Sequence, residues 1–162
     1  MPPTATSFRR LIGSPWRASL FLMTRLPSAY FSGVRVVELH EHSCVATVPY
    51  KWFSRNPFRS TYFACLAMAA ELSTGVLALM HSYGRTPSVS MLVVKIEGEF
   101  FRKATGVTRF TCAQGEALQS AIEQAATSGE AVVLNVRSEG ISAAGEPVAN
   151  FYITWSFKVR KR

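Results

Sequence analysis

Residues 60–84 constrain the fold of this chain more than any other segment. Their 25 residues carry one charged side chain, Glu71, among mostly apolar neighbours. Ser60 or Thr61 is expected to cap a helix that runs to about His81. A helix that is apolar nearly all round must be buried on nearly all sides, and a curled β-sheet buries it with few elements.

Alternating apolar and polar residues elsewhere predict the strands of that sheet. The longest strand is expected to have one polar face and to pair with residues 107–112 as its antiparallel neighbour. Its apolar face is expected to hold Leu92, Val94, Ile96 and Phe100. The expected strands span residues 34–40, 44–50, 89–103, 107–112, 131–137 and 148–159. Helices are expected at residues 7–26, broken near Pro15, and at residues 116–126.

Together these elements predict an α+β fold. A curled antiparallel β-sheet is wrapped around a long central helix, with an N-terminal helix and an extra short helix. Residues 1–32 are expected to form an N-terminal helical extension and residues 33–162 the main domain. The segment 60–80 is about long enough to span a bilayer. Because no aromatic belt flanks it and the following strands alternate, we expect no membrane span.

Charge and residue usage exclude several classes of site. The chain carries 18 Lys and Arg against 10 acidic residues, all glutamate, so its formal net charge is +8. Mechanisms that need an aspartate, such as an aspartic dyad or an EF-hand loop, are therefore excluded. The surplus charge attracts nucleic acid non-specifically, but no helix-turn-helix, zinc-finger or RNP motif indicates dedicated nucleic-acid binding.

Cysteine and histidine patterns argue against a disulfide framework and a metal site. The three cysteines are odd in number and widely spaced, which suits a reducing cytoplasm. Glu38, His40 and His42 alternate and would share one face of an unbroken strand. Because a turn is expected there, we expect exposed hairpin residues at these positions and no bound metal.

Glu71 is the strongest candidate for chemistry. A carboxylate within an apolar helix loses much of its hydration, which raises its pKa and suits it to general base or acid catalysis. The residues alone leave two alternatives open, a glutamate on a narrow solvent-exposed stripe or one paired with a buried arginine. Ser73 and Thr74 beside it either surround a catalytic site or bond only to the helix backbone.

Two motifs resemble those of hotdog-fold acyl-CoA thioesterases of the phenylacetate-degradation type. The run from Asn56 to Ala64, followed by Glu71, resembles the loop that leads through a His-Gly-Gly motif into that family's central helix. Residues 100–106, Phe-Phe-Arg-Lys-Ala-Thr-Gly, resemble its aromatic-aliphatic-Arg-Pro-Ala turn. The resemblance covers roughly residues 33–159 and is strongest to an uncharacterised thioesterase-like subgroup with an extra helix. It implies the hotdog fold, a sheet wrapped around a central helix.

The resemblance also implies roles for individual residues. Glu71 aligns with the catalytic carboxylate, and Asn56 with the asparagine that orients substrate or attacking water. The family's His-Gly-Gly is replaced by Tyr62-Phe63-Ala64, whose backbone N–H groups at the helix start would form an oxyanion site. The Tyr62 hydroxyl either replaces the missing imidazole or belongs to a ring that only packs.

Further residues are expected to bind substrate in a homodimer or homotetramer. If two copies pair residues 89–103 into a continuous sheet, the start of this strand would line the site from the partner side, although an interface strand alone explains it equally well. These residues are Ser88, Ser90 and Met91. Arg59 and Arg102 are expected near the mouth of the site, where they would meet the phosphates of coenzyme A. Coenzyme A is expected only as part of the substrate, with no other cofactor.

The function expected from these residues is hydrolysis of an acyl-CoA or acyl-carrier thioester, with Glu71 as general base or nucleophile. The alternative is a non-catalytic hotdog protein that binds an acyl ligand and lost hydrolysis together with the His-Gly-Gly motif. A basic protein that associates with nucleic acid through charge alone is a third hypothesis.

Overall fold

The computed structural model describes residues 14–160, so residues 7–13 of the expected first helix lie outside the described residues. Its helices are α2 (Pro15–Arg25), α3 (Pro27–Phe31), the short 3-10 helix η1 (Trp52–Ser54), α4 (Phe63–Ser82) and α5 (Gly115–Ser128). Its strands are β1 (Arg35–Leu39), β2 (Cys44–Val48), β3 (Val89–Phe100), β4 (Thr108–Cys112), β5 (Val132–Ser142) and β6 (Pro147–Val159). The predicted order of elements is confirmed, with α3 and η1 as additions.

The long helix begins one residue later than predicted from a Thr61 cap and two residues later than from a Ser60 cap. Its N-cap is Tyr62, which makes no side-chain capping bond. Thr61 is not the cap because its N–H and hydroxyl both donate to the carbonyl of Ala104, at 2.8 and 3.2 Å. The Ser60 hydroxyl instead accepts a hydrogen bond from the side-chain amide of Asn56 at 3.1 Å. The two bonds from Thr61 to Ala104 join the start of α4 to the turn that follows β3.

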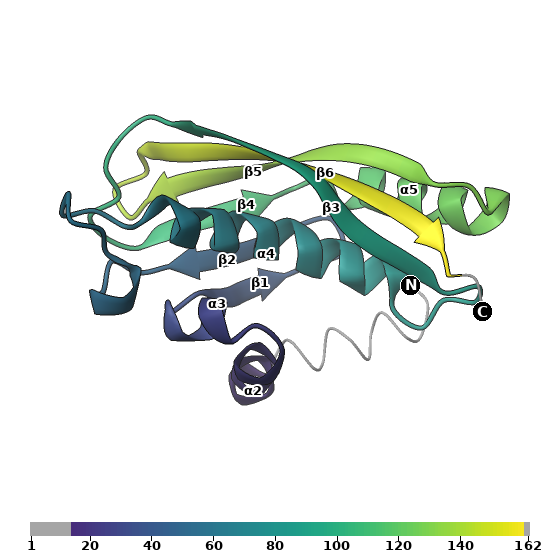
Figure 1. The fold of residues 1–162 in the computed structure, drawn as a ribbon, viewed down its shortest axis with the longest axis horizontal. Coiled ribbons are helices and arrows are strands. Elements are labelled where there is room, and N and C mark those ends of the chain that lie inside the picture. Colours follow the sequence, from purple (N-terminus) through teal and green to yellow (C-terminus); the bar gives the residue numbers. More distant parts are fainter. Residues whose placement is uncertain (1–13, 161–162) are drawn as a thin grey trace.

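Within residues 14–160, six strands form one antiparallel sheet in the order β1-β2-β4-β5-β6-β3. The sheet curls around α4, while α2 and α3 lie below the helix in the view of Figure 1. This arrangement confirms the predicted α+β hotdog architecture. The pairing predicted between β3 and β4 is wrong, because β3 pairs along its length with β6 and β4 lies between β2 and β5. β3 therefore has a free edge in the protomer.

A bulge in β3 reverses the expected alternation. The register with β6 shifts between Val93 and Lys95. Before the shift Val93 lies opposite buried Trp155, and after it Ile96 lies opposite buried Ile153. Cross-strand partners share a face of the sheet, so Ile96 faces the α4 side while Leu92 faces the other. The prediction of one continuous apolar face from Leu92 to Phe100 is therefore wrong.

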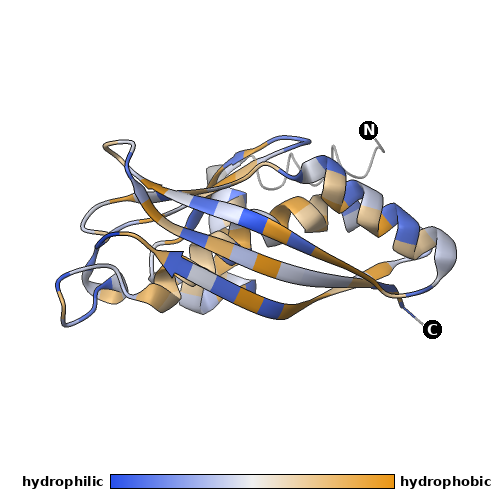
Figure 2. Ribbon diagram, turned by 90° about the horizontal axis from the view of Figure 1, so that it is seen from above, coloured by the Kyte–Doolittle hydropathy of each residue, from blue (hydrophilic) through white to orange (hydrophobic). Residues whose placement is uncertain are grey.

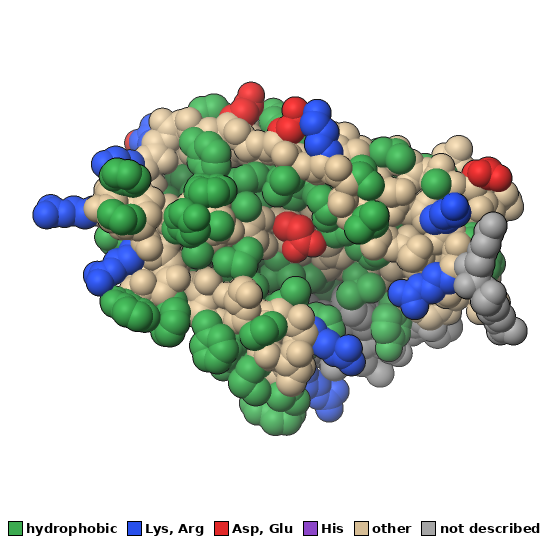
Figure 3. All heavy atoms as spheres, viewed as in Figure 1, with side chains coloured by type: hydrophobic (Ala, Val, Ile, Leu, Met, Phe, Trp, Pro, Cys, Tyr) green, Lys and Arg blue, Asp and Glu red, His purple; other side chains and the backbone are tan. Residues whose placement is uncertain are grey.

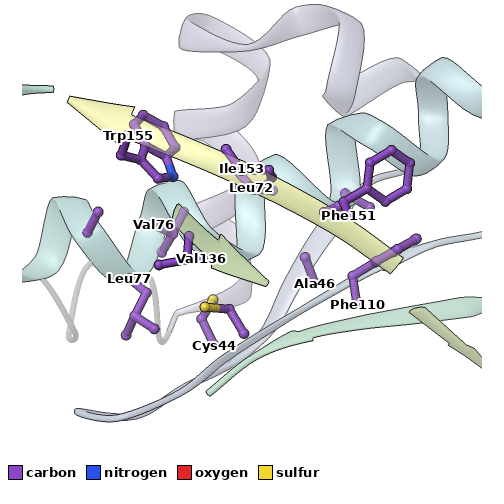
Figure 4. Packing of buried hydrophobic residues seen from close by; sticks show 14 of the residues in the cluster. Cys44, Ala46, Leu72, Val76, Leu77, Phe110, Val136, Phe151, Ile153 and Trp155 are labelled. Carbon is purple, nitrogen blue, oxygen red and sulfur yellow. The ribbon is translucent and has the colours of Figure 1, made fainter. Parts of the chain in front are cut away.

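The core lies between α4 and the concave face of the sheet. β6 alternates from Ala149 to Phe157, and its predicted inward residues are buried. These are Ala149, Phe151, Ile153, Trp155 and Phe157. Figure 4 shows Leu72 and Val76 of α4 close to the inward side chains of β6, and Figure 2 shows the alternation along the strands. α4 has the length and hydropathy of a membrane span, but 67% of its most apolar stretch is buried inside this fold, as in a core helix.

Candidate functional site

One stripe of α4 is left half-exposed by the sheet. Its residues recur at helical spacing and include both Glu71 and the glycine one turn later. They are Ala64, Ala67, Met68, Glu71, Gly75 and Leu79. In Figure 3 hydrophobic side chains dominate the face over α4, with few acidic ones among them. Ile96 of β3 faces the α4 side of the sheet and is nevertheless 47% exposed, so this region of the protomer is incompletely covered.

The Glu71 carboxylate has no ion-pair or hydrogen-bond partner among residues 14–160, which excludes pairing with a described arginine. Loss of hydration on burial is the cause that raises its pKa above the ordinary value for a glutamate. Every fully buried side-chain oxygen among the described residues has a hydrogen-bond partner. The carboxylate oxygens of Glu71 have none, so they are not fully buried and reach open space. Glu71 is thus partly desolvated, unpaired and accessible.

Gly75 and Trp155 shape the space around this carboxylate. A Cβ on Gly75 would lie 2.8 Å from Oε1 of Glu71 and 3.3 Å from the Trp155 ring. The indole Nε1–H of Trp155 donates to the Thr74 hydroxyl at 3.0 Å, and that hydroxyl donates to the Glu71 carbonyl at 2.9 Å. Thr74 therefore connects the ring to the helix backbone, and Ser73 instead bonds to Ser138 at 2.8 Å in the core.

A pocket of about 620 Å³ lies at the start of α4, and four predicted site residues line it. They are Asn56, Tyr62, Phe63 and Arg102. The end of β3 and the turn after it supply further lining, with Phe100, Phe101 and Lys103. Glu71 is not part of the lining; it lies five residues beyond Leu66, the lining residue nearest to it on α4, which is about 7.5 Å along the helix at 1.5 Å per residue. We name this cavity the helix-start pocket.

Asn56 holds the loop that forms one wall of this pocket. Its Oδ1 accepts the backbone N–H of Phe58 at 2.9 Å and that of Ser60 at 3.2 Å. Its side-chain N–H₂ donates to the Ser60 hydroxyl. The carboxamide is therefore engaged within the loop, where it fixes the backbone that leads into α4.

The first turn of α4 leaves backbone donors open. The N–H of Tyr62 donates to the carbonyl of Ser54 at 2.7 Å, and that of Cys65 donates to Tyr62 at 2.9 Å. No side chain caps the helix. Because the first N–H groups of a helix have no intrahelical acceptor, those of Phe63 and Ala64 are without a partner in the described part of the chain. The Phe63 ring, 57% exposed, borders the pocket beside them.

The other predicted site residues lie in different places. Arg102 forms an ion pair with Glu146 at 2.6 Å, and Arg59 lines a neighbouring pocket. The segment from Ser88 to Met91 starts β3, at the far end of α4 from the helix-start pocket, where Arg160 donates its N–H to the carbonyl of Ser88. Ser90 donates to the Lys158 carbonyl at 2.9 Å, and Met91 accepts from Ser82. Within one protomer, the Ser88–Met91 segment therefore does not lie at the helix-start pocket.

Histidine and cysteine contribute no metal centre to the described residues, where no group of three or more possible ligands is assembled. Glu38 pairs with Arg109, and His42 lies 3.7 Å from Glu116. Burial raises the pKa of Cys44 and Cys112, which face each other across β2 and β4, so both thiols stay protonated. Burial also lowers the pKa of His81 near the end of α4.

Several residues of the site were missed by sequence reasoning. Gly75 and Trp155 flank Glu71, but nothing in the local pattern connects them to it, because β6 meets α4 only in the folded chain. Phe58, Phe100 and Phe101 line the helix-start pocket. For the last two a signal existed, since they belong to the motif 100–106 that follows a strongly alternating strand.

The sequence matches, over residues 15–157, a family described as a domain of unknown function, DUF4442. This chain belongs to the DUF4442 family. No curated protein matches its sequence.

Solved structures of low sequence identity share the fold of this DUF4442 chain. A Pseudomonas aeruginosa protein of unknown function, described as a probable thioesterase, superposes with a TM-score of 0.76 at 20% identity, covering 91% of this chain and 97% of that one. The Escherichia coli PaaI protein of the phenylacetic acid degradation operon gives 0.63 at 14%, covering 93% and 96%. A Haemophilus influenzae thioesterase gives 0.64 at 12%, covering 90% and 91%. These likenesses show that the chain shares the hotdog fold of the neighbours.

Proposed function

We propose that this DUF4442 protein hydrolyses acyl thioesters, with Glu71 as general base or nucleophile. The observation that carries the proposal is an unpaired, partly desolvated carboxylate that reaches open space on the half-exposed stripe of α4. A raised pKa keeps such a carboxylate basic enough to accept a proton from water near neutral pH. Alternatively, the carboxylate attacks the thioester carbonyl, the C–S bond breaks and the thiolate leaves, and water then hydrolyses the mixed anhydride to the free acid and regenerates the Glu71 carboxylate.

The start of α4 supplies a complementary group for this chemistry. Phe63 lies about 12 Å along α4 from Glu71, so it is the open N–H groups of Phe63 and Ala64 from a second copy of the chain that would donate to the oxyanion on a thioester carbonyl beside Glu71. The helix-start pocket beside them accommodates the arm that carries the thioester. Asn56 contributes by holding the loop, and Tyr62 and Arg102 line the same cavity.

A second copy of the chain completes this site in our proposal. β3 has a free backbone edge, and Ile96 is exposed on the α4 side of it. Antiparallel pairing of two β3 strands would cover both features. It would also place the Ser88–Met91 segment of one copy beside the Phe100 end of the other, next to the helix-start pocket. A homodimer of this kind would therefore bring Ser88, Ser90 and Met91 to the site, and two dimers would give a tetramer.

A substrate panel tests the hydrolase. Wild type and Glu71→Gln are assayed for thiol release from acyl-CoA esters of short, medium, long and aromatic acyl groups. Turnover that the Gln variant loses supports the proposal, since Gln keeps the shape of the side chain and removes its basicity. Turnover that survives in the Gln variant assigns the chemistry to another group.

One observation favours a non-catalytic acyl-binding protein instead. Phe63 and Ala64 stand where the hotdog-fold thioesterases that the sequence resembles have the two glycines of His-Gly-Gly. The Phe63 ring borders the pocket where a thioester would approach the backbone. The same panel discriminates, because a binding protein would retain acyl-CoA affinity in both variants without turnover. The three cysteines are free thiols in the described residues, which agrees with a cytoplasmic setting for either function.

A further inference from the structure

The surface formed by α2, α3 and η1 exposes large apolar side chains beside one another. Trp16 of α2 is 72% exposed, and Trp52 of η1 is 69% exposed. Phe31 of α3 connects the two regions, because its ring centroid lies 6.2 Å from that of Phe53, which packs edge-on against Trp52 at 4.8 Å. We name this surface the aromatic patch. Its residues are Trp16, Leu20, Met23, Phe31, Trp52 and Phe53.

α2 carries apolar side chains on two opposite faces. Ala18 and Leu22 are buried and hold the helix on the rest of the fold. Trp16, Leu20 and Met23 follow one another at spacings of four and three residues, so they share the outer face, and all three are exposed. A helix that only covers a core has a polar outer face. The outer face of α2 is therefore suited to a partner.

Positive charge surrounds the aromatic patch without any negative charge. Residues 14–37 and 42–70, which include all of α2, α3 and η1, contain no aspartate or glutamate. Figure 3 shows hydrophobic side chains that continue from η1 over α3 to α2, with basic side chains beside them. None of the exposed basic residues of these segments forms an ion pair with a described residue. They are Arg17, Arg25, Lys51, Arg55 and Arg59.

This combination of side chains matches the surface of an anionic lipid bilayer. Tryptophan is favoured at the level of the lipid headgroups, because its ring is apolar and its N–H is polar. An amphipathic helix lies in the same plane with its apolar side chains in the boundary layer, and nearby lysines and arginines are attracted by anionic headgroups. Five basic residues around exposed rings supply both interactions.

A second copy of the chain fits the aromatic patch poorly. A two-fold interface brings the same surface of both copies together, so the basic residues of each patch would face those of the other. Like charges that face each other across an interface are unfavourable. The free strand edge proposed for the dimer belongs to β3, whereas α2 contacts β1 at the opposite end of the strand order. The charge of the patch therefore favours an acidic partner.

We propose that the aromatic patch docks the protein on an anionic lipid bilayer, with the Trp16 and Trp52 rings at headgroup depth and the five basic side chains against the lipid phosphates. The docking is peripheral, because α4, the one helix of residues 14–160 with the length and hydropathy of a span, is a core helix here. The proposal goes beyond the hydrolase and does not depend on it. Figure 1 shows α2 and α3 below α4, where a planar surface can reach them.

Cosedimentation with vesicles tests the docking without relying on catalysis. The vesicles consist of phosphatidylcholine, alone or mixed with phosphatidylglycerol. Trp16→Gln/Leu20→Gln removes apolar contacts from α2, and Arg17→Gln/Arg25→Gln removes two charges. The matched controls are Val133→Gln/Ile141→Gln, two exposed apolar residues of β5, and Lys158→Gln/Arg160→Gln at the end of β6.

We expect wild type to bind the mixed vesicles at least about tenfold more strongly than phosphatidylcholine alone, and each α2 variant to lose about tenfold in affinity for them. The controls should bind like wild type. Equal losses in the controls would reduce the effect to net charge or general hydrophobicity and overturn the proposal, as would undetectable binding of wild type. A changed oligomeric state of Trp16→Gln/Leu20→Gln in light scattering, without vesicle binding by wild type, would assign the patch to a second copy instead.

Tryptophan fluorescence tests which rings enter the bilayer. The chain has three tryptophans, and the third, Trp155, is 4% exposed in the core. Lipids brominated along their acyl chains should quench the emission of wild type when mixed with phosphatidylglycerol. Trp16→Phe/Trp52→Phe keeps aromatic rings on the patch and leaves only Trp155, so its emission should not be quenched. Bound wild type without quenching, or equal quenching of this variant, would overturn the insertion of the two rings.

Discussion

The carboxylate of Glu71 folds back along α4 over Gly75, so that its Oε1 lies 2.8 Å from the point where a Cβ on residue 75 would stand. The same point lies 3.3 Å from the Trp155 ring. The bare backbone at this position leaves room for the carboxylate and the indole together. The absence of a side chain at Gly75 therefore leaves the carboxylate free to lie in this direction.

Gly75→Ala is expected to impair catalysis without destabilising the fold. Replacing glycine by alanine in a helix interior stabilises the helix by up to about 1 kcal/mol. This gain offsets the tight contact of the new methyl group with the indole, so the melting temperature should stay level or rise. The displaced carboxylate should lower kcat by about tenfold to a hundredfold. Thermal melts and steady-state kinetics measure the two effects.

The control for this substitution is the same change made in Glu71→Gln. If Gly75 acts through the carboxylate, alanine should lower the residual rate no further in that background. An alanine variant with wild-type kcat would show that the carboxylate does not need its observed direction.

The pH dependence of stability should report the environment of Glu71. Its pKa is raised in the folded protein, so between the ordinary carboxyl pKa and the raised value the folded state binds more protons than the unfolded state. The free energy of unfolding therefore decreases as pH rises through that window. Glu71→Gln removes this loss, so it should be more stable than wild type at neutral pH and lose that advantage below the ordinary pKa.

Urea unfolding of both proteins across this pH range measures the difference, with Glu130→Gln as an exposed control. A Gln variant that is less stable at neutral pH would contradict an unpaired, desolvated carboxylate. The rate of hydrolysis should increase as pH rises through the same raised pKa, because only the ionised carboxylate accepts a proton or attacks the thioester.

Local patterns were sufficient to predict much of the fold and part of the site. The apolar run with a single charge predicted α4, and alternation predicted the inward residues of β6. The partner of β3 was missed because strand pairing is non-local, and a bulge such as that at Val93 leaves no mark in a single sequence. For the same reason, the sequence left open whether an arginine from a distant part of the chain pairs with Glu71, and the folded structure was needed to answer this.

Thr74→Val should destabilise the protein through Trp155. The indole Nε1–H donates to the Thr74 hydroxyl, and valine keeps the shape of threonine while it removes that acceptor. A buried donor left without a partner costs about 1–3 kcal/mol. Thr74→Ser keeps the hydroxyl and is the matched control. Urea unfolding should show the loss in the valine variant only, and equal stability of valine and wild type would mean that the bond contributes nothing net.

Ile96→Lys should dissociate the proposed dimer and leave the protomer folded. Ile96 is already 47% exposed, so lysine costs the isolated chain little, whereas a charge on the surface where two β3 strands meet is not tolerated. Val133→Lys is the control, since Val133 is 60% exposed and lies on β5, away from that edge. Light scattering after size exclusion should show a dimer or tetramer for wild type and the control, and a monomer for Ile96→Lys. If the Ser88–Met91 segment acts from the second copy, that monomer should also lose thioester turnover, and a fully active monomer would contradict the shared site.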